Sequence, residues 1–219
     1  MVSIKLDKVG KQYNSDWIFS NISCSLSPEE PTVILGANGS GKSTLLQIIL
    51  SSATPTIGKI EYFRNQKSVN AEDAFRLMAI SAPYIELIEE FTLAEMLTFH
   101  GNLKPFVNNL TAKKIIDICG LGKSSGKLIR NFSSGMKQRV KLALAVLSDV
   151  PVILLDEPTS NLDQAGINWY NELVAGNLKG RTVIVSSNSV EYEYSFCNQI
   201  INLEDHKTIP ETDPTLLLF

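Results

Sequence analysis

Apolar and polar residues alternate at the start of the chain, where Val2, Ile4 and Leu6 occupy every second position. Residues 18–26 show a similar alternation. A period of two is typical of strands with one buried face. We therefore expect short, partly exposed strands in the first third of the chain, paired antiparallel.

Further along, compact apolar runs alternate with segments of helical spacing. The runs cover residues 32–35, 152–155 and 182–185, and their uniform apolar character is typical of strands buried on both faces. Apolar residues at helical spacing follow the first run over residues 45–50 and precede the second over residues 140–147. This order predicts an α/β fold with a mostly parallel sheet.

Residues 71–131 have a mainly helical pattern, with candidate helices around residues 94–99 and 115–118. Pro83, Pro105 and Gly120 separate them. We expect one domain over residues 1–219. Its core, with the antiparallel β part, would cover about residues 1–70 and 132–219, and a helical subdomain would be inserted at about residues 71–131.

Composition narrows the possible functions. Hydrophobic residues make up 44% of the 219 residues and charged residues 20%, as in soluble globular proteins. A net charge of −3 provides no basic field, so nucleic acid is not an expected partner. Cys24, Cys119 and Cys197 have no metal-ligand spacing, and we expect reduced, buried thiols in a cytosolic protein.

The sequence has neither the pattern of a signal peptide at its start nor a run of about 18 apolar residues. Any membrane role is therefore expected to depend on a partner. The two histidines, His100 and His206, are expected on the solvated surface.

The strongest chemical signal is a glycine-rich segment between a predicted strand and a predicted helix. Gly36, Gly41, Lys42 and Ser43 satisfy the pattern G-x-x-x-x-G-K-[ST]. Glycines let successive N–H groups surround an anion, and the helix adds its positive N-terminal end. Lys42 would contact the β- and γ-phosphates of ATP, and Ser43 would bind Mg²⁺. The residues expected to bind nucleotide here are Gly36, Ala37, Asn38, Gly39, Ser40, Gly41, Lys42, Ser43 and Thr44.

Two acidic residues follow the apolar run at residues 152–155. Asp156 comes directly after the predicted buried strand, where its carboxylate would bind Mg²⁺. Glu157 would orient or deprotonate a water that attacks the γ-phosphate. The alternative is that both acids only cap the turn before Pro158.

These residues carry a family resemblance. Residues 156–163 read Asp-Glu-Pro-Thr-Ser-Asn-Leu-Asp, which resembles the second nucleotide motif and following aspartate loop of ATP-binding cassette (ABC) proteins. The resemblance covers nearly the whole chain in the family's order of motifs. It implies a phosphate-loop NTPase core, Mg²⁺-dependent ATP hydrolysis and a place for Asp163 in the nucleotide site.

Residues 132–136, Phe-Ser-Ser-Gly-Met, resemble the family's Leu-Ser-Gly-Gly-Gln signature but differ at three of its five positions. In the family this helix start faces the γ-phosphate held by the other subunit. The resemblance therefore implies nucleotide contacts from Ser133, Ser134 and Gly135 across a dimer. The second subunit would be an identical or a different cassette.

Other positions follow or depart from the family pattern. Tyr13 matches the aromatic residue that stacks on adenine, with Trp17 as the alternative. Pro83 stands in place of a glutamine that contacts the metal and water, and Asn188 replaces the switch histidine. Asparagine can bind a phosphate oxygen but takes up no proton near neutral pH.

Two interpretations of these departures remain open. Either the site hydrolyses ATP slowly, with Glu157 as base and Lys42 and Asn188 as the other catalytic residues, or it mainly binds ATP to hold a dimer whose other subunit has a better site. The presence of Lys42, Asp156 and Glu157 favours hydrolysis. Glu86, Glu89 and Glu90 are expected on a charged helix face, with an approach to the metal as the alternative.

A single cassette with a modest helical insert resembles the compact energy-coupling subunit of a transporter. The resemblance implies a transmembrane permease as partner, bound by a helical segment at residues 83–99, and a cytoplasmic location on the inner face of the membrane. The alternatives are a non-transport ABC ATPase and a regulatory partner of a second cassette. The hydrophobic residues 215–219 would cover the core or touch a partner.

Overall fold

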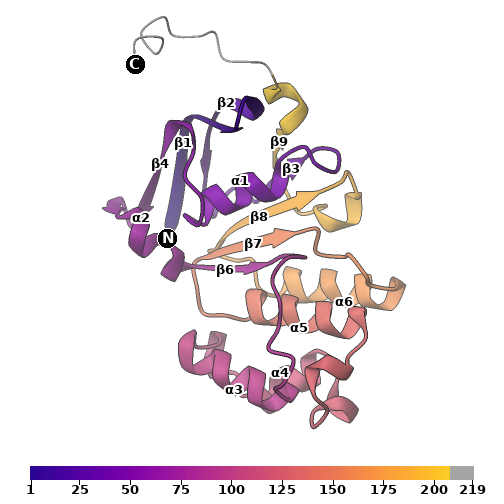
Figure 1. Cartoon of the computed structure of the whole chain (residues 1–219). Helices are drawn as coiled ribbons and strands as arrows, with labels where there is room; N and C mark the ends of the chain where they lie inside the picture. The colour runs from indigo at the N-terminus through magenta and orange to yellow at the C-terminus, as the bar shows by residue number, and fades with distance from the viewer. Residues whose placement is uncertain (208–219) are drawn as a thin grey trace, which may run out of the picture.

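The computed structural model describes residues 1–207, which form two sheets and the helices around them (Figure 1). The antiparallel sheet has the strand order β2-β1-β4-β5. Its strands are β1 (Val2–Tyr13), β2 (Asp16–Leu26), β4 (Ile57–Arg64) and β5 (Lys67–Val69). The second sheet has the order β6-β7-β8-β3-β9, and every pair in it is parallel. Its strands are β6 (Met78–Ser81), β7 (Val152–Asp156), β8 (Thr182–Ser187), β3 (Thr32–Leu35) and β9 (Gln199–Asn202).

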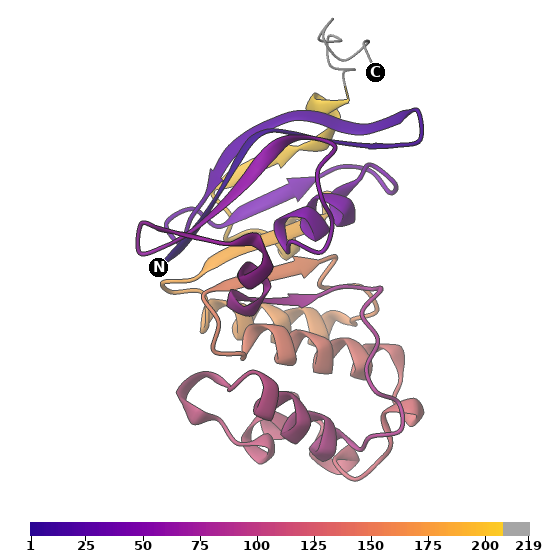
Figure 2. The same ribbon diagram turned by 60° about the vertical axis from the view of Figure 1, so that its left-hand side comes forward.

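The helices lie in separate layers. The α-helices are α1 (Lys42–Ile49), α2 (Ala71–Ala74), α3 (Leu93–Leu103), α4 (Ala112–Ile118), α5 (Ser134–Val146) and α6 (Gln164–Ala175). Short 3-10 turns cover Phe75–Leu77, Val107–Asn109, Gly122–Ser124, Ile129–Asn131, Glu191–Glu193 and Leu203–His206. Helix α1 lies between the two sheets, α5 and α6 cover the other face of the parallel sheet, and α3 and α4 lie beyond them (Figures 1 and 2).

The uniformly apolar strands are explained by burial on both faces. Successive side chains of a strand point to opposite faces, and in β7 Leu154 belongs to the cluster around α1, whereas Ile153 and Leu155 belong to the cluster around α5 and α6. All three are fully buried. The α1 cluster also includes Val2, Ile4 and Leu6 of β1, which explains their alternation.

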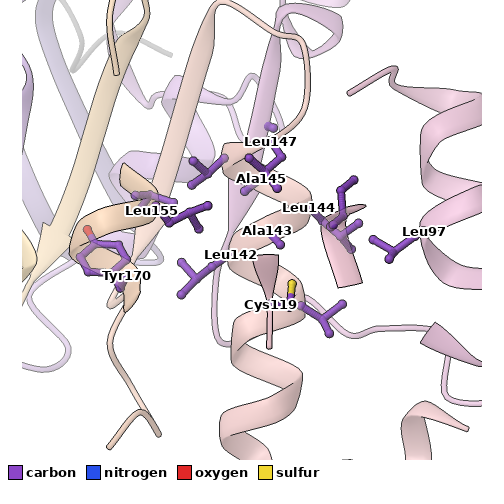
Figure 3. Packing of buried hydrophobic residues seen from close by; sticks show 14 of the residues in the cluster. Leu97, Cys119, Leu142, Ala143, Leu144, Ala145, Leu147, Leu155 and Tyr170 are labelled. Atoms are coloured by element: carbon purple, nitrogen blue, oxygen red, sulfur yellow. The ribbon is translucent and has the colours of Figure 1, made fainter. Parts of the chain in front are cut away.

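Helix α5 is packed on two sides. In Figure 3, Leu142 lies near Leu155 and Tyr170, while Leu144 faces Leu97 of α3. Because these side chains belong to one buried cluster, α5 joins the helical part of the molecule to the parallel sheet.

The expected fold class is confirmed: a mostly parallel sheet, an N-terminal antiparallel sheet and a helical part are all present. Some details of the prediction were wrong. β1 and β2 have 12 and 11 residues, so they are long rather than short.

The boundary of the helical part was also wrong at its start. β6 pairs with β7, so Met78–Ser81 belong to the parallel sheet, and residues 82–91 contain no helix. Thr92 begins α3 with a capping box in which its side chain accepts the Glu95 N–H and the Glu95 side chain accepts the Thr92 N–H. Glu89 therefore lies on a loop, not on a helix face, and forms an ion pair with Lys137 at 2.5 Å.

Two other expectations can be compared with the structure. Cys24, Cys119 and Cys197 are free thiols, but only Cys119 is buried as expected, whereas Cys24 and Cys197 are partly exposed. Burial raises the pKa of Cys119 to about 12. No helix within residues 1–207 is long and apolar enough to cross a membrane. The expectation for residues 215–219 lies outside the described residues.

His100 is not the solvated side chain that the sequence suggested. Its ring stacks on Phe106 with 5.4 Å between ring centroids, and Nε2 lies 2.8 Å from Ser148 Oγ. Since Ser148 Oγ donates to the Leu144 carbonyl, it accepts from the imidazole N–H. Burial, and to a smaller extent the Lys104 charge, lowers the pKa of His100 from 6.5 to about 4.

This lowered pKa predicts a pH-dependent stability. Between about pH 6.5 and pH 4 the unfolded chain protonates His100 while the folded protein keeps it neutral, so the free energy of unfolding should fall as pH falls. Urea denaturation across this range should show a shallower pH dependence for His100→Gln than for the wild type. His206→Gln is the control. Equal slopes for all three proteins would contradict the assignment.

Candidate functional site

The glycine-rich segment forms the loop between β3 and α1. Gly41 caps α1 with φ +105°, a left-handed conformation that suits glycine. A Cβ at this position would lie 2.4 Å from Cγ2 of Ile18 in β2. The loop therefore takes this path only with glycine at position 41.

The loop and the start of α1 are suited to bind an anion. The first turn of α1 carries no acidic residue, and Ala37, Asn38 and Gly39 are exposed. The first N–H groups of a helix lack partners within it and carry partial positive charge, so they attract phosphate.

Lys42 is the centre of the polar contacts at this site. Its ammonium group is almost fully buried and donates to the carbonyls of Gly36 at 2.9 Å and Ala37 at 3.0 Å. It also donates to Asn188 Oδ1 at 2.5 Å. Asn188 Nδ2 in turn donates to Glu157 Oε1 at 2.8 Å, and the same carboxylate oxygen lies 3.9 Å from Lys42 Nζ. The structure thus brings together three predicted catalytic residues from three separate segments: the start of α1 and the loops after β7 and β8.

Asp156 ends β7 and is only 1% exposed. Ser186 Oγ donates to Oδ1, whereas Oδ2 is buried without a hydrogen-bond partner in the described structure. The hydroxyl oxygen of Ser40, in the phosphate loop, is also buried without one. Buried polar oxygens rarely lack partners, and hard cations such as Mg²⁺ bind carboxylate and hydroxyl oxygens. The unpartnered carboxylate oxygen of Asp156 therefore fits a cation held together with Ser43.

Glu157 has an unusual backbone. Its φ of +45° is uncommon for a non-glycine residue. The Glu157 N–H donates to the Ser186 carbonyl at 3.0 Å, and Gln138 Nε2 of α5 donates to the Pro158 carbonyl at 2.8 Å. Such a conformation costs on the order of 1–3 kcal/mol and persists where neighbouring contacts determine it, often at functional sites.

The signature residues contact the loop that follows Glu157. Ser133 caps α5 by accepting the Met136 N–H at 3.3 Å, and Ser134 is the exposed first residue of the helix. A Cβ on Gly135 would lie 2.9 Å from the Asn161 carbonyl oxygen, so glycine permits this close packing. Asp163 caps α6, accepting the Gly166 N–H at 2.8 Å.

The aromatic candidates lie on the β1–β2 hairpin, whose Ile18 packs near Gly41. Tyr13 is 48% exposed, and the Lys11 ammonium lies 4.8 Å from its ring centroid. Trp17 is partly buried near Gly10. The exposed ring of Tyr13 is therefore the better surface for stacking of a nucleobase.

Tyr84, which lies near Asp156, and Gln47 were not expected at the site from the sequence. Pro83 is exposed, and the next residue, Tyr84, lies near Gln47 of α1. Burial raises the pKa of Tyr84 to about 12, and the negative charge of Asp156 contributes. Gln47 lies far from Pro83 in sequence, so local spacing gave no signal for this arrangement.

The fold and the site define a nucleotide-binding protein with a phosphate loop. A family model described as "ABC transporter" matches residues 19–160, and the chain belongs to that family. It is 28% identical over 221 residues to the Nod factor export ATP-binding protein I of Rhizobium johnstonii, covering 99% of this chain and 71% of that protein. It is also 28% identical over 186 residues to the uncharacterized ABC transporter ATP-binding protein YcbN of Bacillus subtilis, covering 84% and 61% of the two chains.

Solved structures share the fold. A putative ABC transporter ATP-binding protein from Pyrococcus furiosus superposes with a TM-score of 0.78 and 21% identity, covering 94% of this chain and all of that one. A dimeric bacterial ABC transporter cassette gives a TM-score of 0.74 and 23% identity, covering 91% and 93% of the two chains.

The geometry of Gly41 predicts the effect of its substitution. Gly41→Ala should weaken ATP binding by about tenfold or more, because the new Cβ would displace the loop N–H groups from the phosphate position. Gly122→Ala is the control, since a Cβ there would meet nothing within 4 Å. Titration with a fluorescent ATP analogue measures both, and circular dichroism checks that the variants fold. Equal affinities would contradict the role of the loop.

Proposed function

We propose that this protein binds ATP with Mg²⁺ and hydrolyses it as the energy-coupling subunit of a membrane transporter. The observation that carries the proposal is the contact of Lys42, Asn188 and Glu157 beside the phosphate loop. Each residue has a separate use in phosphoryl transfer.

The phosphate loop would bind the nucleotide. Residues 36–44 would surround the β- and γ-phosphates with backbone N–H groups, and Lys42 would exchange its carbonyl partners for phosphate oxygens. Ser43 and the unpaired oxygen of Asp156 would hold Mg²⁺, which supplies neutralisation of the phosphate charge. Tyr13 would stack on adenine.

Glu157 is the candidate general base. It would accept a proton from water as the water oxygen attacks the γ-phosphorus and ADP leaves, so the products are ADP and inorganic phosphate. Asn188 already donates to this carboxylate and would orient it. Because asparagine does not take up a proton near neutral pH, we expect slower turnover than with histidine.

A second cassette would complete the site. Ser133, Ser134 and Gly135 lie at the start of the 13-residue helix α5, whose N-terminal end favours an anion. Asp163 starts the neighbouring helix α6. We propose that these residues face the nucleotide bound by a second copy or by a different cassette. The dimeric bacterial cassette, which shares the fold, supports this arrangement.

The transport role is supported by family membership and by the printed names of the relatives. The proposed permease surface is the loop at residues 82–91 with α3. It includes a cleft of about 270 Å³ whose lining contains Ile85, Leu87 and Leu103. Leu103 is 68% exposed and would add apolar area to this surface. The protein would then lie on the cytoplasmic face of the membrane.

Hydrolysis can be tested with two substitutions. Glu157→Gln should lower kcat for ATP by about 100-fold while ATP still binds, because the amide cannot act as a base. Asn188→His should raise kcat. A phosphate-release assay measures turnover, and analogue titration measures binding. If neither substitution changes turnover, the protein is instead a mainly ATP-binding partner of a second cassette, which the departures at residues 134, 136 and 188 would then explain.

The permease surface can be tested separately. Alanine substitutions at Ile85, Phe99 and Leu103 should reduce recovery of the cassette with its membrane partner in a pull-down from detergent-solubilised membranes, because they remove apolar contact area at the surface. Ile200→Ala is a control, since this exposed residue lies on β9 at the far edge of the parallel sheet. Unchanged recovery with intact folding would overturn the assignment.

A further inference from the structure

Glu193 is a buried acidic residue that the proposed chemistry does not use. It ends the 3-10 turn Glu191–Glu193, which follows β8. Glu193 is only 3% exposed, whereas Glu191 on the same turn is exposed. A buried carboxylate is costly unless donors satisfy it.

The loop after β7 and the last residue of β8, which leads into the loop of Asn188, supply those donors. Oε1 of Glu193 accepts the Thr159 N–H at 3.1 Å and the Thr159 hydroxyl at 2.5 Å. Oε2 accepts the hydroxyl of Ser187. The Tyr170 hydroxyl of α6 donates to the Glu193 carbonyl at 2.8 Å and holds the turn in place.

The two loops are those that carry the candidate base and its amide partner. Thr159 stands two residues after Glu157, and Ser187 stands directly before Asn188. We infer that Glu193 is a positioning residue that joins these loops and so keeps Glu157 and Asn188 within hydrogen-bond distance for ATP hydrolysis. This inference rests on the proposed function and deepens it.

The backbone of Glu157 explains why such a connection is needed. Its φ of +45° is unfavourable for a glutamate, so the residue relaxes unless contacts on both sides determine it. The Ser186 carbonyl accepts the Glu157 N–H, and Gln138 donates to the Pro158 carbonyl. Glu193 accepts the Thr159 N–H. Within this set, the Glu193 side chain bonds both to the loop of Glu157, through Thr159, and to Ser187, directly before Asn188.

A carboxylate suits this place better than an amide. Both oxygens of Glu193 accept, and they receive three donors. A glutamine would turn an NH₂ group toward Ser187 Oγ, which already accepts the Val190 N–H at 3.1 Å, and the serine hydroxyl would lose its acceptor.

The test compares Glu193→Gln and Thr159→Val, alone and together, in the full-length protein. Thr159→Val keeps the amide and the shape of the side chain but removes one donor. Glu191→Gln, on the exposed side of the same turn, is the matched control. The measurements are kcat, the dissociation constant for ATP, the melting temperature, and backbone hydrogen exchange of a peptide covering residues 157–162.

We expect Glu193→Gln to lower kcat by about tenfold or more while the dissociation constant changes by less than about twofold, because the base is misplaced but the phosphate loop is intact. The double variant should be no slower than the slower single variant, since both changes break one network. Exchange at residues 157–162 should accelerate in Glu193→Gln and not in Glu191→Gln.

Unchanged kcat, or a fall in kcat accompanied by an equal loss of ATP affinity, would overturn the inference. Reductions in kcat of the two single variants that multiply in the double variant would also overturn the inference. If the wild type hydrolyses no ATP, the proposed hydrolysis fails and hydrogen exchange alone decides: faster exchange in Glu193→Gln supports the positioning role, and unchanged exchange rejects it.

Discussion

The parallel direction of the strands in the second sheet is the constraint on which the site depends. Because β3, β7 and β8 run the same way, their carboxyl ends meet at one edge. The phosphate loop follows β3, Asp156 and Glu157 come at the end of β7, and Asn188 follows β8. Residues more than 140 positions apart in the chain, such as Lys42 and Asn188, are in contact for this reason.

The polar contacts at this edge form one connected set. Lys42 contacts Asn188, Asn188 contacts Glu157, and Glu193 reaches both the loop of Glu157 and the loop of Asn188. The strained backbone of Glu157 lies within it. A change in one loop therefore alters the placement of the others, and substitutions here should not act independently.

Much of this arrangement could be predicted from residue patterns. The uniform apolar runs indicated the buried strands, and the glycine–lysine pattern located the phosphate loop, because both signals are local. β6 was missed because four residues among helical neighbours give a weak periodic signal. The burial of His100 was missed because Phe106 and Ser148 are brought to it only by tertiary packing.

The contacts of Glu193 and Tyr84 could not be predicted for a related reason. Glu193 is an acid on a short turn, and its partners Thr159 and Ser187 come from two other loops. Tyr84 meets Gln47 from a helix that precedes it by more than 30 residues. Patterns along the chain describe neighbours in sequence, whereas these contacts depend on how the strands are ordered in the sheet.

The position of α1 between the two sheets has a further consequence. Leu45, Leu46, Ile48 and Ile49 are completely buried in the cluster that both sheets share, so the helix is fixed over its whole length. The ordering of its first turn thus takes place during folding. An anion that arrives there meets N–H groups already aligned, so association loses less conformational entropy than it would at a flexible loop.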